Sequence, residues 1–143
     1  MNMRILGLDV GTKRIGIAIS DELGWTAQGV KTLYRRNGES DLREIRDIVM
    51  QYGVEKIVVG LPKNMDGSLG PQAEMALGFV EELREIVGVP VVTWDERLST
   101  VEATKMFIRA DVSRKKRKRK VDIVAAVLIL QSYLDSLARK GNR

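Results

Sequence analysis

Near its N-terminus the chain reads ILGLDVGTKRIGIAIS, residues 5–20. Apolar and β-branched residues flank a Gly-Thr-Lys-Arg segment, which predicts two strands joined by a tight turn. One carboxylate, Asp9, interrupts the first strand. Because an apolar strand is a costly place for a charge, Asp9 must pair with a protein cation, with backbone donors or with a bound metal ion. Lys13 and Arg14 could supply a simple ion pair, so the hairpin alone leaves these interpretations open.

The size and composition of the chain indicate a single folded domain. The 143 residues are 44% apolar, enough to bury a core and too apolar for disorder throughout. No apolar run reaches the roughly 18 residues that span a bilayer. The N-terminus does not show the basic, apolar and small-residue order of a signal peptide. We therefore expect a soluble, cytoplasmic protein.

Two missing residue types narrow the possible chemistry. The chain contains neither Cys nor His. The absence of Cys excludes disulfides, zinc–thiolate sites and thiol nucleophiles. The absence of His removes the usual general base and the Ser-His-Asp arrangement. Any catalysis must therefore use carboxylates, Lys, hydroxyl groups or metal ions bound through oxygen.

The positive charge of the chain is concentrated in one segment. The net charge is +5, and the run RKKRKRK, residues 114–120, contributes +7, so the rest of the chain carries −2. Such a run marks contact with a polyanion or a solvated, solubilising segment. Because it is internal rather than terminal, we favour contact with a nucleic-acid backbone through Arg114, Lys115, Lys116, Arg117, Lys118, Arg119 and Lys120.

The order of predicted elements indicates an α/β fold. The hairpin is followed by a strand at Trp25–Leu33, a helix from Ser40 or Asp41 that Gly53 ends, and a strand at Lys56–Gly60. A loop at Leu61–Gly70 then leads to a helix that begins at Pro71 and that Gly88 ends, followed by a strand at Val89–Trp94. After it come a helix from Ser99, with Ala103, Met106, Phe107 and Ala110 inward, and a last helix from about Val121 to Ala138. Three hairpin-connected strands followed by βαβ units predict one mixed five-stranded sheet with helices on both faces.

Two further groups of carboxylates lie where such folds place their sites. Asp95 and Glu96 follow the last predicted strand, and sites in open α/β sheets gather at the carboxyl ends of strands. Only one of these two neighbours should point into the site, and the spacing does not choose between them. Asp122 falls in the first turn of the predicted last helix. There it either complements the helix dipole, worth about 0.3–1 kcal/mol, or serves a site.

If Asp9, Glu96 and Asp122 converge, they form an all-oxygen cage that hard cations stabilise. Mg²⁺ or Mn²⁺ fits these ligands. Two such ions about 3.5–4 Å apart can activate water and stabilise the leaving oxygen of a phosphodiester without any His. The substrate phosphates would then approach Lys13, Arg14, Lys63, Arg97 and the basic segment. For Arg97, an ion pair with a neighbouring acid is an equally good explanation.

Four separated blocks resemble the YqgF/RuvX family of small bacterial proteins. They are GLDVGTKRIGIA at 7–18, VGLPKNMDGS at 59–68, DERLST at 95–100, and KVD at 120–122 with Ala125 and Ala126. The blocks stand in the family's order and cover nearly the whole chain. The resemblance implies a ribonuclease H-like fold related to the RuvC Holliday junction resolvases. It also implies that Asp9, Glu96 and Asp122 are catalytic, metal-binding acids, with Asp95 a lesser candidate.

The family is described both as Holliday junction resolvases and as nucleases that mature the 5′ end of pre-16S rRNA. The resemblance therefore implies a metal-dependent nuclease acting on structured RNA or branched DNA, and we expect rRNA processing to be the main role. A junction resolvase needs two active sites and hence a homodimer, whereas an RNA-processing nuclease does not.

Two other classes of function compete with a nuclease. The hairpin resembles the phosphate loop of actin-like ATPases, but those proteins close a second lobe over the nucleotide, and a chain of this length lacks it. A non-catalytic nucleic-acid-binding module would need only the basic segment for salt-dependent binding. Mutation of the acids discriminates, because it would abolish cleavage by a nuclease and leave binding by such a module unchanged.

Overall fold

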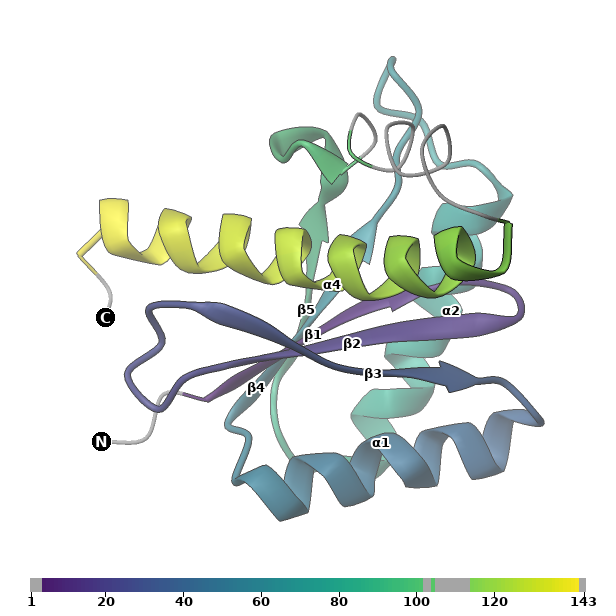
Figure 1. Ribbon diagram of the computed structural model, residues 1–143, viewed down its shortest axis with the longest axis horizontal. Coiled ribbons are helices and arrows are strands. Elements are labelled where there is room, and N and C mark those ends of the chain that lie inside the picture. Colours follow the sequence, from purple (N-terminus) through teal and green to yellow (C-terminus); the bar gives the residue numbers. More distant parts are fainter. Residues whose placement is uncertain (1–3, 102–103, 105–113, 142–143) are drawn as a thin grey trace.

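The computed structural model describes residues 4–101, 104 and 114–141, without the side chains of 114–122. Its centre is a five-stranded sheet of order β3-β2-β1-β4-β5 (Figure 1). The strands are β1 Ile5–Val10, β2 Arg14–Ser20, β3 Ala27–Tyr34, β4 Lys56–Leu61 and β5 Val91–Asp95. The first three are antiparallel, whereas β1, β4 and β5 run parallel. The predicted hairpin and mixed sheet are confirmed.

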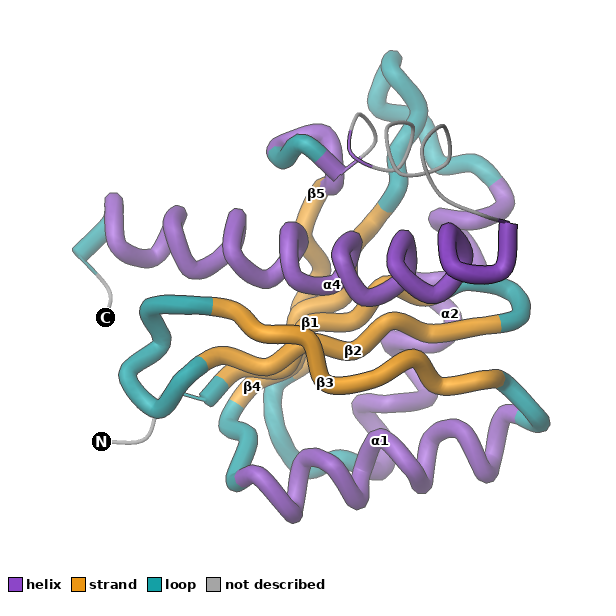
Figure 2. The backbone as a smooth tube through the Cα atoms, in the orientation of Figure 1, coloured by secondary structure: helices purple, strands orange, loops and turns teal. Residues whose placement is uncertain are grey.

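Helices cover both faces of the sheet, as predicted (Figure 2). Helix α1, Gly38–Tyr52, and helix α2, Pro71–Ile86, contribute to one apolar core with the residues of the sheet that face them. Helix α4, Arg114–Arg139, packs against β1, β2, β3 and β4 on the opposite face and forms a second core. Within each strand alternate residues therefore belong to different cores, and this alternation fixes which face Asp9 occupies.

The start of helix α1 depends on a side-chain cap. Asn37 Oδ1 accepts a hydrogen bond of 2.9 Å from the backbone N–H of Ser40, and at the other end Gly53 adopts a left-handed conformation with φ 65°. The helix begins two or three residues earlier than the spacing of apolar residues suggests, because the cap and not the first apolar residue sets its boundary.

Removing this cap is expected to destabilise the protein. Asn37→Ala should lower the free energy of unfolding by about 1 kcal/mol, because the N–H of Ser40 loses its partner. Asn37→Asp keeps an acceptor oxygen and should stay close to wild type. Urea unfolding followed by circular dichroism measures both variants. Equal loss in the two would show that the oxygen acceptor is not what matters.

The other described boundaries shift by at most two residues, except at the last helix. Strand β3 begins two residues after Trp25, and β5 begins at Val91 because Pro90 cannot donate to a ladder. Helix α2 buries Ala76 and Phe79, whereas Leu77 is only partly buried. Residues 102–103 and 105–113 lie outside the described residues, so the predicted inward positions Ala103, Met106, Phe107 and Ala110 have no structural description.

The prediction for the last helix was wrong at its N-terminus. Helix α4 begins at Arg114 and not at Val121, so the backbone of the basic run forms its first turns. Lys and Arg are good helix formers, and a charged run therefore need not end a helix. As a consequence Asp122 stands eight residues into the helix. The helix dipole acts within about one turn and cannot explain an acid at that position.

Within the described part of the chain, no helix combines the length and the apolarity that crossing a bilayer requires.

Candidate nuclease site

Asp9 lies near the carboxyl end of β1, on the face that α4 covers. Leu6, Leu8 and Val10 belong to the core under α1 and α2, so the alternate residues point the other way. Gly7 confirms this assignment, because a Cβ there would lie 2.7 Å from Cβ of Leu130 in α4. The Asp9 side chain is half-buried. Asp9 therefore lies at the carboxyl end of the sheet, on the face that α4 covers.

Gly60 in β4 is the neighbour of Asp9 across the parallel ladder. The register pairs Leu8 with Val59, so Asp9 and Gly60 follow as the next pair on the α4 face. A Cβ on Gly60 would lie 2.9 Å from Oε2 of Glu96 and would collide with Ile129 of α4. The Glu96 carboxylate thus occupies the space above Gly60. Because neighbouring strands lie about 4.8 Å apart, the Glu96 carboxylate lies about one strand away from Asp9 on the same face of the sheet.

The turn after β5 separates the roles of the two adjacent acids. Glu96 opens a 3₁₀ turn, η1 Glu96–Leu98, and is 97% buried. Asp95 points away from it and pairs with Arg97. Its carboxylate accepts bonds of 3.1 Å from Nε and 2.7 Å from Nη2 of Arg97, and one of 2.9 Å from the Arg97 backbone N–H. Of the two adjacent acids, Glu96 is therefore the one buried over Gly60, whereas Asp95 is paired with Arg97.

The ion pair between Asp95 and Arg97 predicts a lowered pKa for Asp95. Hydrogen bonding from Arg97 holds the pKa of Asp95 below its ordinary value of 3.8. Because the folded-state pKa is depressed, the pair stabilises the fold above about pH 4, and this contribution is lost as the pH falls through the lowered pKa. Arg97→Gln should return the pKa of Asp95 toward 3.8. Carboxyl carbon NMR of Asp95 across pH 1.5–6 measures it, and an identical titration curve in both proteins would contradict the assignment.

Glu96 and Arg97 line a pocket of about 370 Å³ together with the loop between β4 and α2 and with Gln72 of α2. The loop contributes Lys63 and Met65 to the wall. The positive charge of Lys63 also lowers the pKa of Asp95. The structure therefore brings two predicted phosphate-binding residues, Lys63 and Arg97, to the predicted acid Glu96.

Lys13 and Arg14 follow Asp9 in the chain at the hairpin turn. Arg35, in the segment between β3 and α1, fixes this turn through hydrogen bonds. The N–H of Gly11 donates to the carbonyl of Arg14 at 2.8 Å. Arg35 donates through Nη1 to the carbonyl of Gly11 at 2.9 Å and through its backbone N–H to the carbonyl of Lys13 at 2.9 Å. The buried Asp41 accepts from Nε of Arg35 at 3.4 Å. This network positions the turn beside Asp9.

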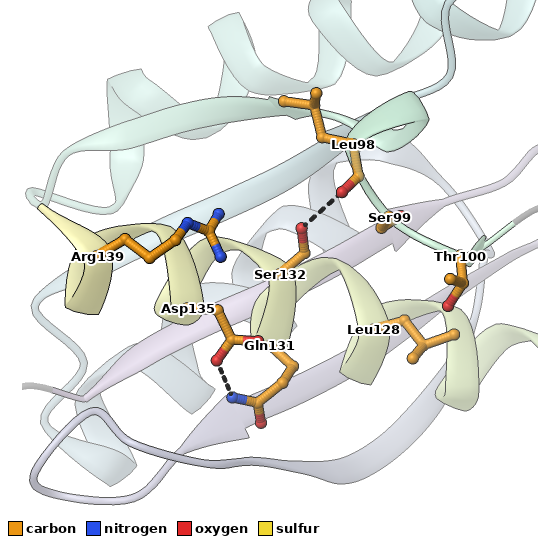
Figure 3. A pocket seen from close by; sticks show the side chains of 8 residues that line it. All are labelled: Leu98, Ser99, Thr100, Leu128, Gln131, Ser132, Asp135 and Arg139. Atoms are coloured by element: carbon orange, nitrogen blue, oxygen red, sulfur yellow. Dashed lines mark hydrogen bonds between the residues drawn. The ribbon is translucent and has the colours of Figure 1, made fainter.

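Helix α4 supports the Glu96 turn from the other side. Ser132 Oγ donates to the carbonyl of Leu98 at 3.3 Å (Figure 3). It also accepts a 2.9 Å bond from Nε1 of Trp94. Below the turn, Ser99 Oγ donates to the carbonyl of Glu96 at 2.8 Å. A second pocket of about 260 Å³ opens here, between Leu98 and the C-terminal half of α4, and none of the predicted acids lines it.

The remaining predicted residues are placed only by their backbone. Asp122 and the basic residues 114–120 lie in α4, and their side chains lie outside the described residues. Among the side chains that are described, no three carboxylates gather closely enough to hold a metal ion. The structure thus brings Asp9, Glu96, Lys63 and Arg97 to one end of the sheet and leaves the third acid as a prediction.

Sequence reasoning missed the residues that shape the site. Gly60 had a readable signal, because a Gly inside an apolar strand often marks a close approach by another group. Gln72 carried no such signal, since Gln is common on surfaces. Arg35 donates to a turn more than 20 residues away and is itself paired with Asp41, and nothing in the local sequence indicates this.

Nearly the whole chain matches a family model. The model for "RuvX: Holliday junction resolvase" matches residues 3–136. A protein of Moorella thermoacetica is 56% identical over 139 residues, which cover 97% of this chain and 99% of the relative. One of Bacillus pumilus is 58% identical over 137 residues, covering 94% and 99%. Both relatives are named "Putative pre-16S rRNA nuclease".

Solved structures show the same fold at low identity. Thermus thermophilus RuvC in complex with a Holliday junction superposes with a TM-score of 0.66 at 17% identity, over 97% of this chain and 96% of that one. The Fowlpox virus resolvase bound to junction DNA gives 0.54 at 14% identity, over 94% and 99%. The fold is ribonuclease H-like. By its sequence, this chain belongs to the RuvX, or YqgF, family of nucleases.

Proposed function

We propose that this protein is a divalent-metal-dependent nuclease that processes the 5′ end of pre-16S rRNA, with Asp9, Glu96 and Asp122 as its catalytic acids. The observation that carries the proposal is the buried carboxylate of Glu96, placed above Gly60 and beside Asp9. Burying a carboxylate costs folding free energy, so buried acids beside basic side chains often belong to a functional site. Here the combination suits phosphodiester chemistry.

The donor set fits Mg²⁺ or Mn²⁺. All candidate ligands are carboxylate oxygens, which these hard cations prefer. The missing Cβ of Gly60 leaves the space in which the Glu96 carboxylate lies. Asp122 stands three, four and seven residues before Ala125, Ala126 and Ile129, all buried against the sheet. Helical periodicity gives it the same face of α4. When bound, such ions supply activation of water and stabilisation of the leaving oxygen.

The chain's own residues bind and orient the nucleic acid. Lys63 and Arg97 in the pocket wall, and Lys13 and Arg14 at the hairpin turn, would contact backbone phosphates near the acids. Asp95 holds the Arg97 guanidinium in a fixed orientation through its paired bonds. The basic run at the start of α4 would add contacts farther along the strand, which makes binding steeply salt-dependent.

The choice of substrate rests on the relatives. Proteins 56–58% identical to this chain are named pre-16S rRNA nucleases, and rRNA precursors are made in the bacterial cytoplasm, so this assignment also implies a cytoplasmic location. The family description and the junction-bound structures with the same fold favour a second candidate, cleavage of Holliday junctions by a homodimer. A binding module without catalysis is the third.

A substrate panel tests these alternatives. Purified protein is incubated with an RNA spanning the pre-16S 5′ end, a four-way DNA junction, and matched single and double strands, each with Mg²⁺, Mn²⁺ or EDTA. Metal-dependent cleavage at the mature rRNA end supports the proposal. Symmetric cleavage of the junction, together with a dimeric mass by light scattering, supports resolution instead. Binding to every substrate with cleavage of none would contradict both nuclease assignments.

A further inference from the structure

The pocket beside Glu96 combines features that suit one nucleotide. Its volume of about 370 Å³ is near the lower end for ligand pockets, which run from about 300 to 1,000 Å³. Its lining offers Lys63 and Arg97 as cations, the Gln72 amide as a hydrogen-bonding group, and the side chain of Met65. A nucleotide presents a matching set, namely an anionic phosphate, polar base edges and an apolar base face.

Met65 is the most unusual member of this set. Its side chain is 95% exposed, although it lines the pocket that contains Glu96. Leu69 in the same loop is also exposed, at 43%. Large apolar side chains are usually buried, so a loop that exposes two of them beside a pocket is a candidate contact surface.

Hydrogen bonds fix the backbone of the loop that carries Met65. The Gly67 N–H donates to the carbonyl of Asn64 at 2.9 Å, and the Asn64 side chain donates to Ser68 Oγ at 2.9 Å. Ser68 in turn donates to Asp66 Oδ1. Arg97 Nη1 lies 3.4 Å from the carbonyl oxygen of Met65 and ties the loop to the Glu96 turn. Because these bonds fix the loop, its backbone does not have to become ordered when a ligand contacts Met65.

We propose that this pocket receives one unpaired nucleotide adjacent to the scissile phosphate, with the base face on Met65 and a base edge at Gln72. This inference rests on the proposed nuclease function and specifies its substrate class. Bases inside a duplex cover one another's faces, whereas an unpaired base can place its face on a protein side chain. The enzyme therefore selects strands that are unpaired at the cleavage point over continuous duplex.

The test measures binding in a background without cleavage. Asp9→Asn protein is titrated against two RNAs that carry 2-aminopurine at the same position, once unpaired in a single strand and once paired in a continuous duplex. Fluorescence of the probe reports its environment, and anisotropy gives Kd. The second substitution is Met65→Ala. Its matched control is Met50→Ala, because Met50 in α1 is also exposed, at 73%, and is distant from the pocket in sequence.

We expect Met65→Ala to weaken binding of the unpaired strand about two- to tenfold, the range of a sulfur–aromatic contact, and to leave duplex binding unchanged. Met50→Ala should change neither Kd. The probe's fluorescence should change on binding of the single strand only. Equal effects of Met65→Ala on both RNAs, no effect on either, or no binding of the single strand at all would overturn the inference.

Cleavage by the wild-type protein distinguishes a failure of this inference from a failure of the proposed nuclease function. If the wild type cleaves and Met65→Ala leaves its preference for unpaired strands unchanged, the pocket assignment is wrong and the nuclease function is retained. If no substrate is cleaved and the Met65-dependent difference in binding persists, the nuclease function is wrong and the pocket is retained as a nucleotide-binding site.

Discussion

Asp9→Asn is expected to lower metal-dependent cleavage by about 10³-fold or more without unfolding the protein. The substitution keeps the shape of the side chain and removes the charge that the proposed metal site requires. Asp9 is half-buried at the end of β1, and its amide isostere fits the same space. Removing one charge from a group of acids also relieves their repulsion, so the melting temperature should stay level or rise. Single-turnover cleavage and thermal unfolding measure the two effects.

The adjacent acids after β5 provide the matched comparison. Glu96→Gln should reduce cleavage as severely as Asp9→Asn, because its carboxylate lies above Gly60. Asp95→Asn should cost only about tenfold, since Asp95 orients Arg97 and does not line the pocket that contains Glu96. The reverse order, with Asp95→Asn inactive and Glu96→Gln active, would show that the two roles have been exchanged.

Gly60→Ala, which adds a single methyl group, is expected to lower both the free energy of unfolding and the rate of cleavage. The added Cβ would lie 2.9 Å from Oε2 of Glu96 and collide with the side chain of Ile129. Overpacking of this kind costs about 1–3 kcal/mol. Because the methyl group also displaces the Glu96 carboxylate, cleavage should fall by about 10²-fold or more even at temperatures where the variant is fully folded. Urea unfolding and single-turnover cleavage at 15 °C separate the two effects.

Gly78→Ala is the control for that experiment. Gly78 lies in helix α2 with nothing within 4 Å of the added Cβ, so the substitution should stabilise the protein by about 0.5–1 kcal/mol and leave cleavage unchanged. If Gly60→Ala were as stable and as active as wild type, the close approach of Glu96 to β4 would not exist in solution.

The fold was largely predictable because its elements carry local signals. The hairpin around residues 11–14 and the start of α2 at Pro71 are visible as turn and helix signals. The N-terminus of α4 was not, because apolar periodicity begins only near Val121 while the charged residues before it are equally good helix formers. Periodicity reports which face of a helix is buried and says nothing of where a solvated helix begins.

The site was predictable in its chemistry and less so in its geometry. The lack of His and Cys, together with Asp9 and Glu96 at strand ends, indicated oxygen-ligated metal chemistry. The choice between Asp95 and Glu96 needed the structure, because it depends on where β5 ends and the 3₁₀ turn begins. The support of the hairpin turn by Arg35 could not be read from the sequence, since it joins residues that meet only in the folded sheet.

Crystals of the wild-type protein soaked in Mn²⁺ test the central claim most directly. An anomalous difference map locates Mn²⁺ independently of any assay or substrate. The account predicts a peak within coordination distance of carboxylate oxygens of both Asp9 and Glu96, above Gly60, and no such peak in crystals of Asp9→Asn. Fully occupied Mn²⁺ elsewhere in the molecule, with Asp9 and Glu96 uncoordinated, would contradict the assignment of these acids as the metal site.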